Sequence, residues 1–360
     1  MFEIQGQYNT AKIFTDNIDN EAITSIYEFL RLECLKDSKI RIMPDTCVSK
    51  TAVVGTVITI DDFVVPGLIG ADIGCGMLVA KLNVKEIDGT KLDNVIREYI
   101  PNGFRIREKA ISKSNVGEIL AESDTETAYK SLGTLGGGNH FIEVDKDDED
   151  NLYLVIHSGS RNLGKEVFTY YHEIAKKTAS DFRVPKNIAP LTGKDYENYI
   201  HDMKLTQEHA DINRQTMLKE ILYHMNWKAE NVFDCIHNYI DTEKKILRKG
   251  AISAEKGEKV IIPMNMRDGS LICVGKGNED WICSGPHGAG RIMSRSQAKE
   301  LISMEEYAKA MEGIFTTSVK ATTIDEAPQV YKNMYEIMEN IKDTVSIEKI
   351  IKPVYNFKAN

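Results

Sequence analysis

Residues 70–77 read Gly-Ala-Asp-Ile-Gly-Cys-Gly-Met, and they follow a long apolar run at residues 52–65. The run is rich in β-branched residues and predicts strands, and residues 77–82 predict another strand directly after the glycines. Glycine lets the backbone turn sharply between two such strands. The turn therefore presents Asp72 and Cys75 close together, and a carboxylate and a thiolate are both good metal ligands.

The rest of the chain mixes strands and helices without a clear domain boundary. We expect the run at 52–65 to form a strand pair joined near residues 61–62. Further helices are expected at 22–36, 292–312 and 326–345, and further strands at 152–156, 260–262 and 270–274. Residues 164–249 are expected to be mostly helical, with a proline-containing break near 185–193. We predict one large α+β domain over residues 1–360, with central β-sheets flanked by helices and a helical insert at about 164–249.

Composition predicts a soluble, cytoplasmic protein. The six cysteines form no Cys-x-x-Cys pair, which favours reduced thiols. A charge at Glu3 interrupts the place where a signal peptide needs an apolar core, and no apolar run reaches the roughly 20 residues of a membrane span. The net charge of −9 argues against a general nucleic-acid coat protein, so any nucleic-acid contact must be local, in a cleft lined by arginines.

Four more short motifs place polar side chains together, mostly beside glycines. They are Gly136-Gly-Gly-Asn139-His140-Phe-Ile-Glu143, His157-Ser-Gly-Ser-Arg161, His237-Asn238 and His287-Gly-Ala-Gly-Arg291. Thiolate, imidazole and carboxylate ligands suit a divalent transition metal, and by themselves they indicate zinc. One thiolate can also bridge two metal ions. The alternative is structural, with Asp72 capping the turn and Cys75 buried as a small apolar residue.

Two other patterns have ordinary explanations. Residues 159–166 match a phosphate-binding P-loop through Lys165, but Glu166 stands where a Ser or Thr hydroxyl must bind Mg²⁺. Four histidines without glycine or arginine neighbours are assigned to packed or solvated helix faces: His172, His201, His209 and His224. His237 is expected on a helix at residues 232–240, where a histidine alone is more often structural than a ligand.

His287 has a different setting from the other histidines. Small residues follow it, a helix is predicted to begin near residue 293, and such a helix N-terminus favours an anion. Arg291 and Arg295 lie one turn apart and can grip phosphate oxygens. An imidazole there can act as a covalent nucleophile on phosphorus. The alternative, that His287 is a further metal ligand, does not explain its arginine neighbours.

The five motifs, in this order, resemble the RtcB family of RNA-splicing ligases from about residue 40 to the C-terminus. The resemblance implies two Mn²⁺ ions beside a histidine that GTP guanylylates. It also implies that an RNA 3′-phosphate or 2′,3′-cyclic phosphate is joined to a 5′-hydroxyl end. A cyclic phosphate is opened first, GMP then moves to the 3′-phosphate to give an RNA(3′)pp(5′)G end, and the 5′-hydroxyl finally expels GMP.

The resemblance also assigns roles to individual residues. Asp72, Cys75 and His140 are implied to hold one metal, with Cys75 bridging to a second held by His157 and His237. His287 is implied to carry GMP, and Arg161, Arg291 and Arg295 to bind RNA phosphates. The implied nucleotide contacts are Asn139, Glu143, Asn238, Pro263, Asn265, Met266, Ser270, Gly288, Ala289, Gly290 and Lys358, the last of which reads guanine.

The sequence departs from the family pattern at two places. Cys47 stands where the family usually has a histidine, and Ser49 where glycine is common. Residues 263–266 read Pro-Met-Asn-Met in place of Pro-Gly-Ser-Met. These departures indicate a divergent branch, serving RNA repair or tRNA splicing, without a membrane partner. An activating protein partner is compatible with the pattern, and a monomer is favoured. The competing hypotheses are a non-catalytic protein that binds RNA ends and a binuclear metal phosphoesterase.

Overall fold

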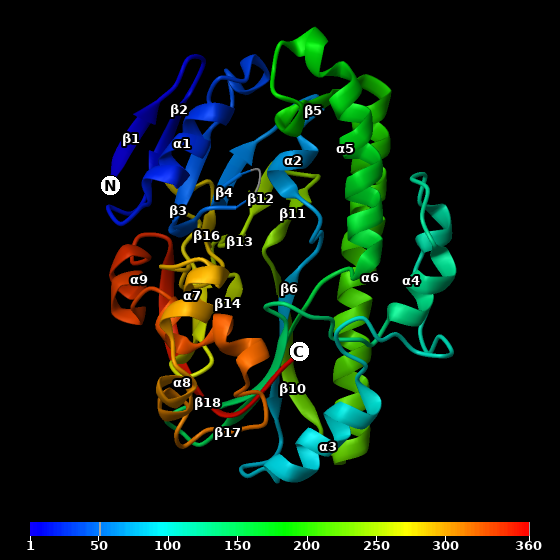
Figure 1. Cartoon of the computed structure of the whole chain (residues 1–360), viewed down its shortest axis with the longest axis vertical. Coiled ribbons are helices and arrows are strands. Elements are labelled where there is room, and N and C mark those ends of the chain that lie inside the picture. Colours follow the sequence, from blue (N-terminus) through cyan, green and yellow to red (C-terminus); the bar gives the residue numbers. More distant parts are fainter. Residues whose placement is uncertain (50–51, 360) are drawn as a thin grey trace.

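Two β-sheets form the centre of the computed structural model, which describes residues 1–49 and 52–359 (Figure 1). The smaller sheet has the order β1-β2-β3-β4-β12-β11. Its strands are β1 (Phe2–Gln5), β2 (Thr10–Ile13), β3 (Ile40–Cys47), β4 (Val54–Thr59), β12 (Ile246–Lys249) and β11 (Asn238–Asp241). All its pairings are antiparallel except β2 with β3.

The larger sheet has the order β10-β6-β8-β7-β18-β15-β14, with β17 beside β18. Its strands are β10 (Ala229–Ile236), β6 (Gly76–Leu82), β8 (Leu152–Ser158), β7 (Phe141–Lys146), β18 (Val345–Lys358), β15 (Gly269–Gly275), β14 (Lys259–Asn265) and β17 (Phe315–Thr316). Two short pairs complete the set: β13 (Ala251–Ser253) with β16 (Ser284–Pro286), and β5 (Phe63–Val64) with β9 (Leu191–Thr192).

Helices cover both faces of the larger sheet. The helices are α1 (Asn20–Phe29), α2 (Pro66–Ile69), α3 (Gly89–Tyr99), α4 (Thr125–Ser131), α5 (Asn162–Phe182), α6 (Gly193–Met225), α7 (Arg295–Leu301), α8 (Met304–Ala310) and α9 (Met334–Asn340). Along β6, Leu78 packs in one apolar cluster with α3 and α6, whereas Val79 packs in another with α9. Successive side chains of a strand point to opposite faces, so an unbroken apolar run builds both clusters.

The structure confirms the predicted mixed α+β class. The long helices α5 and α6 lie side by side along one edge of the molecule and form the helical part of the predicted insert (Figure 1). That insert is helical only to Met225, because strands β10, β11 and β12 occupy its last part. The expected helix at 232–240 is therefore wrong. Its Val, Phe, Cys and Ile residues favour a strand once β6 offers a pairing edge.

Other element predictions differ in detail. The strands predicted within 52–65 are β4 and β5, but they pair in different sheets and not with each other. The helix expected at 292–312 is divided into α7 and α8 because Ser303 caps a new helix there, with Glu306 completing a capping box. The helix expected at 326–345 is limited to α9, preceded by a 3₁₀ turn at Pro328–Val330. The one expected at 22–36 ends at Phe29 and is followed by a 3₁₀ turn at Glu33–Leu35.

Candidate active site

The turn at residues 70–77 connects α2 to β6. Gly70 and Gly74 have φ angles of 81° and 72°, a region that side chains disfavour, so these two positions need glycine. Cys75 donates its backbone N–H to the carbonyl of Asp72, and its own carbonyl accepts from the N–H of His237 at 2.9 Å. Ile236 pairs with Gly76 in the sheet, and this register places His237 beside Cys75.

Five ligand-type atoms converge at this turn. The Sγ atom of Cys75 lies 3.5 Å from Nε2 of His140 and 3.2 Å from Nε2 of His157. Nε2 of His157 lies 3.3 Å from Nε2 of His237. A carboxylate oxygen of Asp72 lies 3.7 Å from Nε2 of His140. The structure thus brings together all five residues that were predicted as metal ligands, from turns and strands far apart in the sequence.

Backbone carbonyl groups fix the orientation of two of these imidazoles. Nδ1 of His140 donates to the carbonyl of Leu135 at 2.8 Å, and Nδ1 of His157 donates to that of Asn139 at 3.1 Å. With the proton on Nδ1, each Nε2 presents a lone pair to the centre of the cluster. This arrangement is characteristic of metal-binding histidines.

The charge states that the fold favours also suit a cation. Burial, together with neighbouring histidines, lowers the pKa values of His157 and His237 far enough to keep both rings neutral. Burial opposes ionisation of Asp72, but its proximity to His140 outweighs burial and lowers its pKa. Burial and the Asp72 charge raise the pKa of Cys75, so a bound cation is needed to stabilise its thiolate. Cys75, His140 and His157 form a buried group of the right size for a metal ion.

Arg214 of α6 holds the backbone that carries the cluster. Its fully buried guanidinium donates to the carbonyls of Gly74 and Ser158, each at 2.8 Å, and pairs with Asp234 at 2.6 and 2.7 Å. One side chain therefore ties the 70–77 turn to strand β8. Burial and these bonds make it a rigid base for the ligand-bearing strands.

Gly159 and Gly164, which make residues 159–166 similar to a P-loop, are needed for packing. A Cβ atom at Gly159 would lie 2.6 Å from a carboxylate oxygen of Asp72, and one at Gly164 would lie 2.8 Å from the carbonyl of Ala71. Both glycines thus allow β8 and α5 to approach the 70–77 turn closely. This close approach accounts for them without a bound phosphate.

His287 follows β16 and lies beside the cluster, with its ring 4.9 Å from that of His237. Its Nδ1 is 2.6 Å from Oδ2 of Asp45, which also accepts from the backbone N–H groups of His287 and Gly288. Asp45 is fully buried in β3 and was given no role in the sequence analysis. Asp45 lies directly after Met43-Pro44, in the part of the chain that resembles the family, and this position could have identified it as a site residue.

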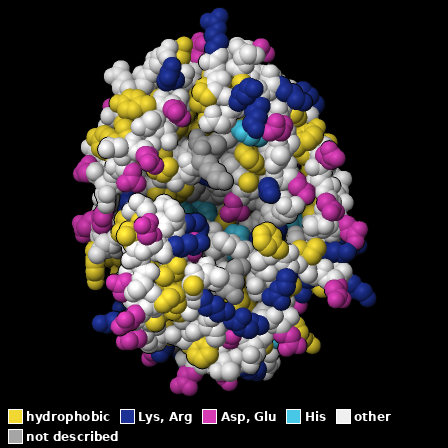
Figure 2. Space-filling model, viewed as in Figure 1, with side chains coloured by type: hydrophobic (Ala, Val, Ile, Leu, Met, Phe, Trp, Pro, Cys, Tyr) yellow, Lys and Arg dark blue, Asp and Glu magenta, His cyan; other side chains and the backbone are white. Residues whose placement is uncertain are grey.

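A cleft opens beside His287 and separates it from the end of β18. Figure 2 shows a hollow near the middle of this face, with histidines visible in it and Lys and Arg side chains beside it. Nine of the eleven predicted nucleotide contacts line the cleft: Asn139, Glu143, Pro263, Asn265, Met266, Gly288, Ala289, Gly290 and Lys358. The cleft is also lined by residues without a predicted role, namely Cys47, Val54, Phe141, Met264, Glu326, Tyr331 and Asn356.

Two predicted nucleotide contacts lie outside the cleft lining. The Asn238 amide donates to the carbonyls of Ile69 and Asp72 and so supports the 70–77 turn. Ser270 is buried in β15, and its hydroxyl has no hydrogen-bond partner within the described part of the chain.

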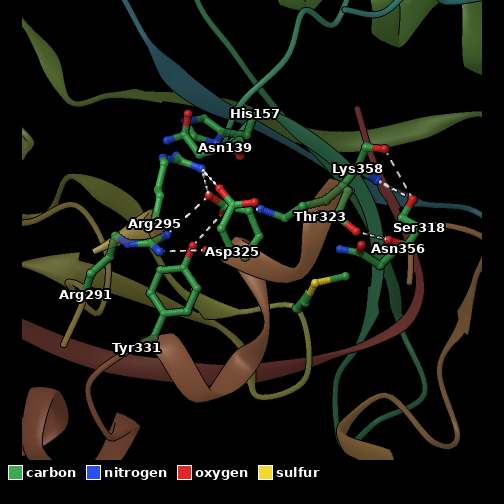
Figure 3. A network of polar contacts seen from close by, with 12 residues as sticks. Asn139, His157, Arg291, Arg295, Ser318, Thr323, Asp325, Tyr331, Asn356 and Lys358 are labelled. Atoms are coloured by element: carbon green, nitrogen blue, oxygen red, sulfur yellow. Dashed lines mark hydrogen bonds and ion pairs between the residues drawn. The ribbon is translucent and has the colours of Figure 1, made fainter. Parts of the chain in front are cut away.

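Glu326 joins the cationic side chains of the cleft into one network. Its carboxylate contacts Lys358 at 2.7 Å, Arg295 at 2.6 Å and the Tyr331 hydroxyl at 2.7 Å. Arg291 lies 3.4 Å from it and also donates to the carbonyl of Asp325. Figure 3 shows this network, in which Arg291 and Arg295 approach from one side and Lys358 from the other. The cleft thus holds several cations around one buried carboxylate.

Arg161, the third predicted RNA contact, lies away from that network. It donates to the Thr134 hydroxyl at 3.2 Å and to the carbonyl of Gly103 at 3.3 Å. A Cβ atom at Gly136 would overlap its guanidinium, so glycine is required there. Burial lowers the pKa of Arg161, and the nearby charge of Asp72 opposes that change. Arg161 therefore lies on the side of the metal cluster, not of the cleft.

Comparison with known proteins places these features in a family. Residues 30–125 and 105–359 match the family model described as "tRNA-splicing ligase RtcB". The "RNA-splicing ligase RtcB" of Escherichia coli (strain K12) is 30% identical over 372 residues, which cover 89% of this chain and 90% of that protein. The "tRNA-splicing ligase RtcB" of Nanoarchaeum equitans is 29% identical, with 80% of each chain covered. That of Aeropyrum pernix is 28% identical, with 75% of this chain and 69% of that protein covered.

Within residues 1–49 and 52–359, no helix is both long enough and apolar enough to cross a membrane.

Proposed function

The chain belongs to the RtcB family of RNA-splicing ligases, and on this basis we propose that it is a GTP- and Mn²⁺-dependent RNA ligase. It joins RNA ends that carry a 3′-phosphate or 2′,3′-cyclic phosphate to 5′-hydroxyl ends, in RNA repair or tRNA splicing. The observation that carries the proposal is the position of His287. Its ring lies between the cluster of ligand-type side chains around Cys75 and the cationic cleft. The buried carboxylate of Asp45 orients the ring.

We assign two Mn²⁺ ions to the cluster on the basis of its donor set. Asp72, Cys75 and His140 would hold one ion, and Cys75, His157 and His237 the other. The ions would neutralise charge on the phosphoryl group being transferred. The Nδ1 atom of His237 has no hydrogen-bond partner among the described residues, whereas its Nε2 faces that of His157. A cation between these two neutral rings would satisfy both facing lone pairs.

His287 is the nucleophile in this proposal. Asp45 holds the proton on Nδ1, which leaves the lone pair of Nε2 free to attack the α-phosphorus of GTP. The new N–P bond replaces the bond to pyrophosphate, which leaves. The 3′-phosphate of RNA then takes GMP from His287, and attack of the 5′-hydroxyl on that phosphate expels GMP. Water opens a cyclic phosphate before these steps.

The cleft residues bind the nucleotide and the RNA phosphates. Lys358, at the end of β18, would contact guanine, and the backbone at Gly288–Gly290 would approach the phosphates closely. Arg291 and Arg295 would exchange their contacts with Glu326 and Asp325 for RNA phosphate oxygens. Arg161 would bind a phosphate on the metal side. Asn238 and Ser270 would act indirectly, because neither lines the cleft.

A cytoplasmic location fits the cysteine chemistry. All six cysteines are free thiols, and the proposed metal bridge needs Cys75 reduced. We also propose that the protein is a monomer and that a protein activator assists it. Measurement of its molecular mass in solution, with and without RNA, tests the monomeric state.

The test is incubation with Mn²⁺ and α-labelled GTP, followed by a denaturing gel and intact mass spectrometry. A mass increase of one GMP is expected, and it should disappear in His287→Ala while two metal ions remain bound. His209→Ala is the control for loss of an imidazole, since His209 is buried and lies outside both the cluster and the cleft. Absence of the adduct with Mn²⁺ bound would contradict the proposal and favour an RNA-end-binding protein. Hydrolysis of phosphoesters without GTP would favour a phosphoesterase.

A further inference from the structure

An aromatic side chain is fully exposed close to the metal cluster. Phe104 has a relative exposure of 106%, the highest among the large apolar residues of the described chain. It lies in the segment 103–113, which belongs to the connection between α3 and α4 (Figure 1). Ile106 and Ile111 in the same segment are exposed at 40% and 49%. Exposed apolar groups of this kind mark a contact surface more often than a single scattered residue does.

The same segment is positively charged in an acidic protein. It contains Arg105, Arg107, Lys109 and Lys113 but a single acidic residue, Glu108, whereas the whole chain carries a net charge of −9. Within the described residues, the side chains of Arg105, Lys109 and Lys113 form no hydrogen bond or ion pair, and all three are exposed. These charges are therefore available for an anionic partner.

The backbone of the segment is held in place at its start. Arg107 donates to the carbonyls of Tyr99 and Gly133 at 2.8 Å and of Leu132 at 3.1 Å. The N–H of Gly103 donates to the carbonyl of Gly136 at 2.7 Å. Phe104 therefore projects from a fixed position, and an aromatic ring that is held in advance loses little entropy on binding.

These contacts also connect the segment to the metal cluster. Gly136 lies four residues before His140, and Arg161 lies four residues after His157. Arg161 donates to the carbonyl of Gly103, directly before Phe104. Phe104 thus lies beside Arg161, which is outside the cleft lining and is already proposed to bind an RNA phosphate.

We propose that the segment 103–113 binds single-stranded RNA next to the reacting end, with a base stacked on Phe104 and phosphates at Arg105, Lys109 and Lys113. This inference rests on the proposed ligase function. Exposed aromatic rings among unpaired cations are the usual means of binding single-stranded nucleic acid. A protein partner would favour a larger apolar centre with fewer charges.

The test measures binding of a fluorescent single-stranded RNA of 12 nucleotides with a 3′-phosphate, by anisotropy. Phe104→Ala is expected to weaken binding about 5- to 100-fold, and Phe104→Trp to restore it, because stacking contributes about 1 to 3 kcal/mol per base. Changing Arg105, Lys109 and Lys113 together to Gln should flatten the dependence of affinity on salt concentration. Tyr335→Ala, which removes an exposed aromatic ring from α9, is the matched control.

The outcomes separate this inference from the proposed function. Unchanged RNA affinity in Phe104→Ala would overturn the inference, even if the wild-type protein forms the GMP adduct. Conversely, weaker RNA binding in Phe104→Ala without any wild-type adduct would support the RNA surface and contradict the ligase. If Phe104→Ala instead changes the sedimentation of the protein and leaves RNA affinity intact, the surface binds protein and the inference is wrong. Because Phe104 is fully exposed, the variant should unfold at the wild-type temperature.

Discussion

Asp45 and His287 are separated by 242 positions in the sequence and are joined by a hydrogen bond of 2.6 Å between Oδ2 and Nδ1. The same carboxylate oxygen accepts the backbone N–H groups of His287 and Gly288 at 3.1 and 3.2 Å. Strand β3 of the smaller sheet therefore sets the tautomer of a histidine that follows β16. The proposed nucleophile is therefore oriented by a residue that lies outside its own motif.

Asp45→Asn should slow formation of the GMP adduct by at least about 100-fold. The amide oxygen of Asn can replace Oδ2 and accept the same three N–H groups, but it is neutral. It therefore no longer stabilises the positive charge that develops on the imidazole of His287 as Nε2 attacks phosphorus. The measurement is the single-turnover rate of labelling by α-labelled GTP at saturating Mn²⁺.

Asp93→Asn is the control for a loss caused by lower stability alone. Asp93 is also buried and hydrogen-bonded, to Arg97, Thr317 and Tyr355, but it lies outside the cleft lining. Adduct formation at the wild-type rate in Asp45→Asn would show that the charge of Asp45 does not assist attack by His287.

Cys75→Ala should remove both metal ions. Its sulfur lies within 3.5 Å of Nε2 of both His140 and His157, so a single thiolate is shared by both halves of the cluster. Metal content is measured by mass spectrometry after dialysis against Mn²⁺. Cys235→Ala is the matched control, because Cys235 is also buried but packs in an apolar cluster. One ion retained at full occupancy in Cys75→Ala would rule out a bridging sulfur.

Glu326→Gln should destabilise the protein by about 3 to 5 kcal/mol and weaken GTP binding. The substitution leaves Lys358, which is 6% exposed, without its carboxylate partner, and an unpaired buried charge is costly. Burial opposes the ionisation of Glu326, but Lys358 and Arg295 outweigh it and lower its pKa to about 2. Its stabilising effect is therefore complete above the ordinary pKa of 4.5 and is lost as the pH falls toward 2.

Urea unfolding between pH 3 and pH 7 and calorimetric titration with GTP test the role of Glu326. Glu339→Gln removes an exposed ion pair with Lys342 and should change neither quantity. Wild-type stability of Glu326→Gln at pH 7 would mean that Lys358 finds another partner.

The motifs, through the family that they resemble, were sufficient to predict which residues meet at the cluster around Cys75. The glycines at 70–77 and the strands at 77–82 and 152–156 are local features, and local sequence specifies them. The secondary structure around His237, in contrast, could not be predicted from neighbouring residues. Its apolar neighbours fit a helix, and only the pairing of Cys235 with Met77 in the sheet makes them a strand. Tertiary pairing overrides weak local preference in this way.

The groups that orient the site could not be predicted for a similar reason. The contacts of Asp45 with His287 and of Glu326 with Lys358 join segments that the sequence keeps far apart. No motif next to either carboxylate indicates which residue it contacts. The exposure of Phe104 is also invisible in sequence, because a phenylalanine is usually buried and only the fold shows this side chain at the surface.

Two carboxylates at the end of strand β7 have opposite electrostatic settings. Asp145 is fully buried, and neither carboxylate oxygen has a hydrogen-bond donor within the described chain. Burial, followed by the charge of Glu143, raises its pKa well above the ordinary 3.8. Burial also opposes the ionisation of Asp147, just after β7, but Asn151 and Lys349 donate to it and lower its pKa.

Asp145→Asn should therefore stabilise the protein at pH 8, whereas Asp147→Asn should destabilise it. Above pH 3.8, native Asp145 holds a proton that the unfolded chain has lost, so the free energy of unfolding falls by up to about 1.4 kcal/mol per pH unit until the raised pKa is reached. The isosteric amide cannot ionise and removes this slope. Asp147 has the opposite sign, because its contribution is present above 3.8 and is lost at lower pH. Urea unfolding of both variants from pH 2 to pH 9 measures the two slopes. Lower stability of Asp145→Asn at pH 8 would mean that Asp145 is ionised and paired in the native protein.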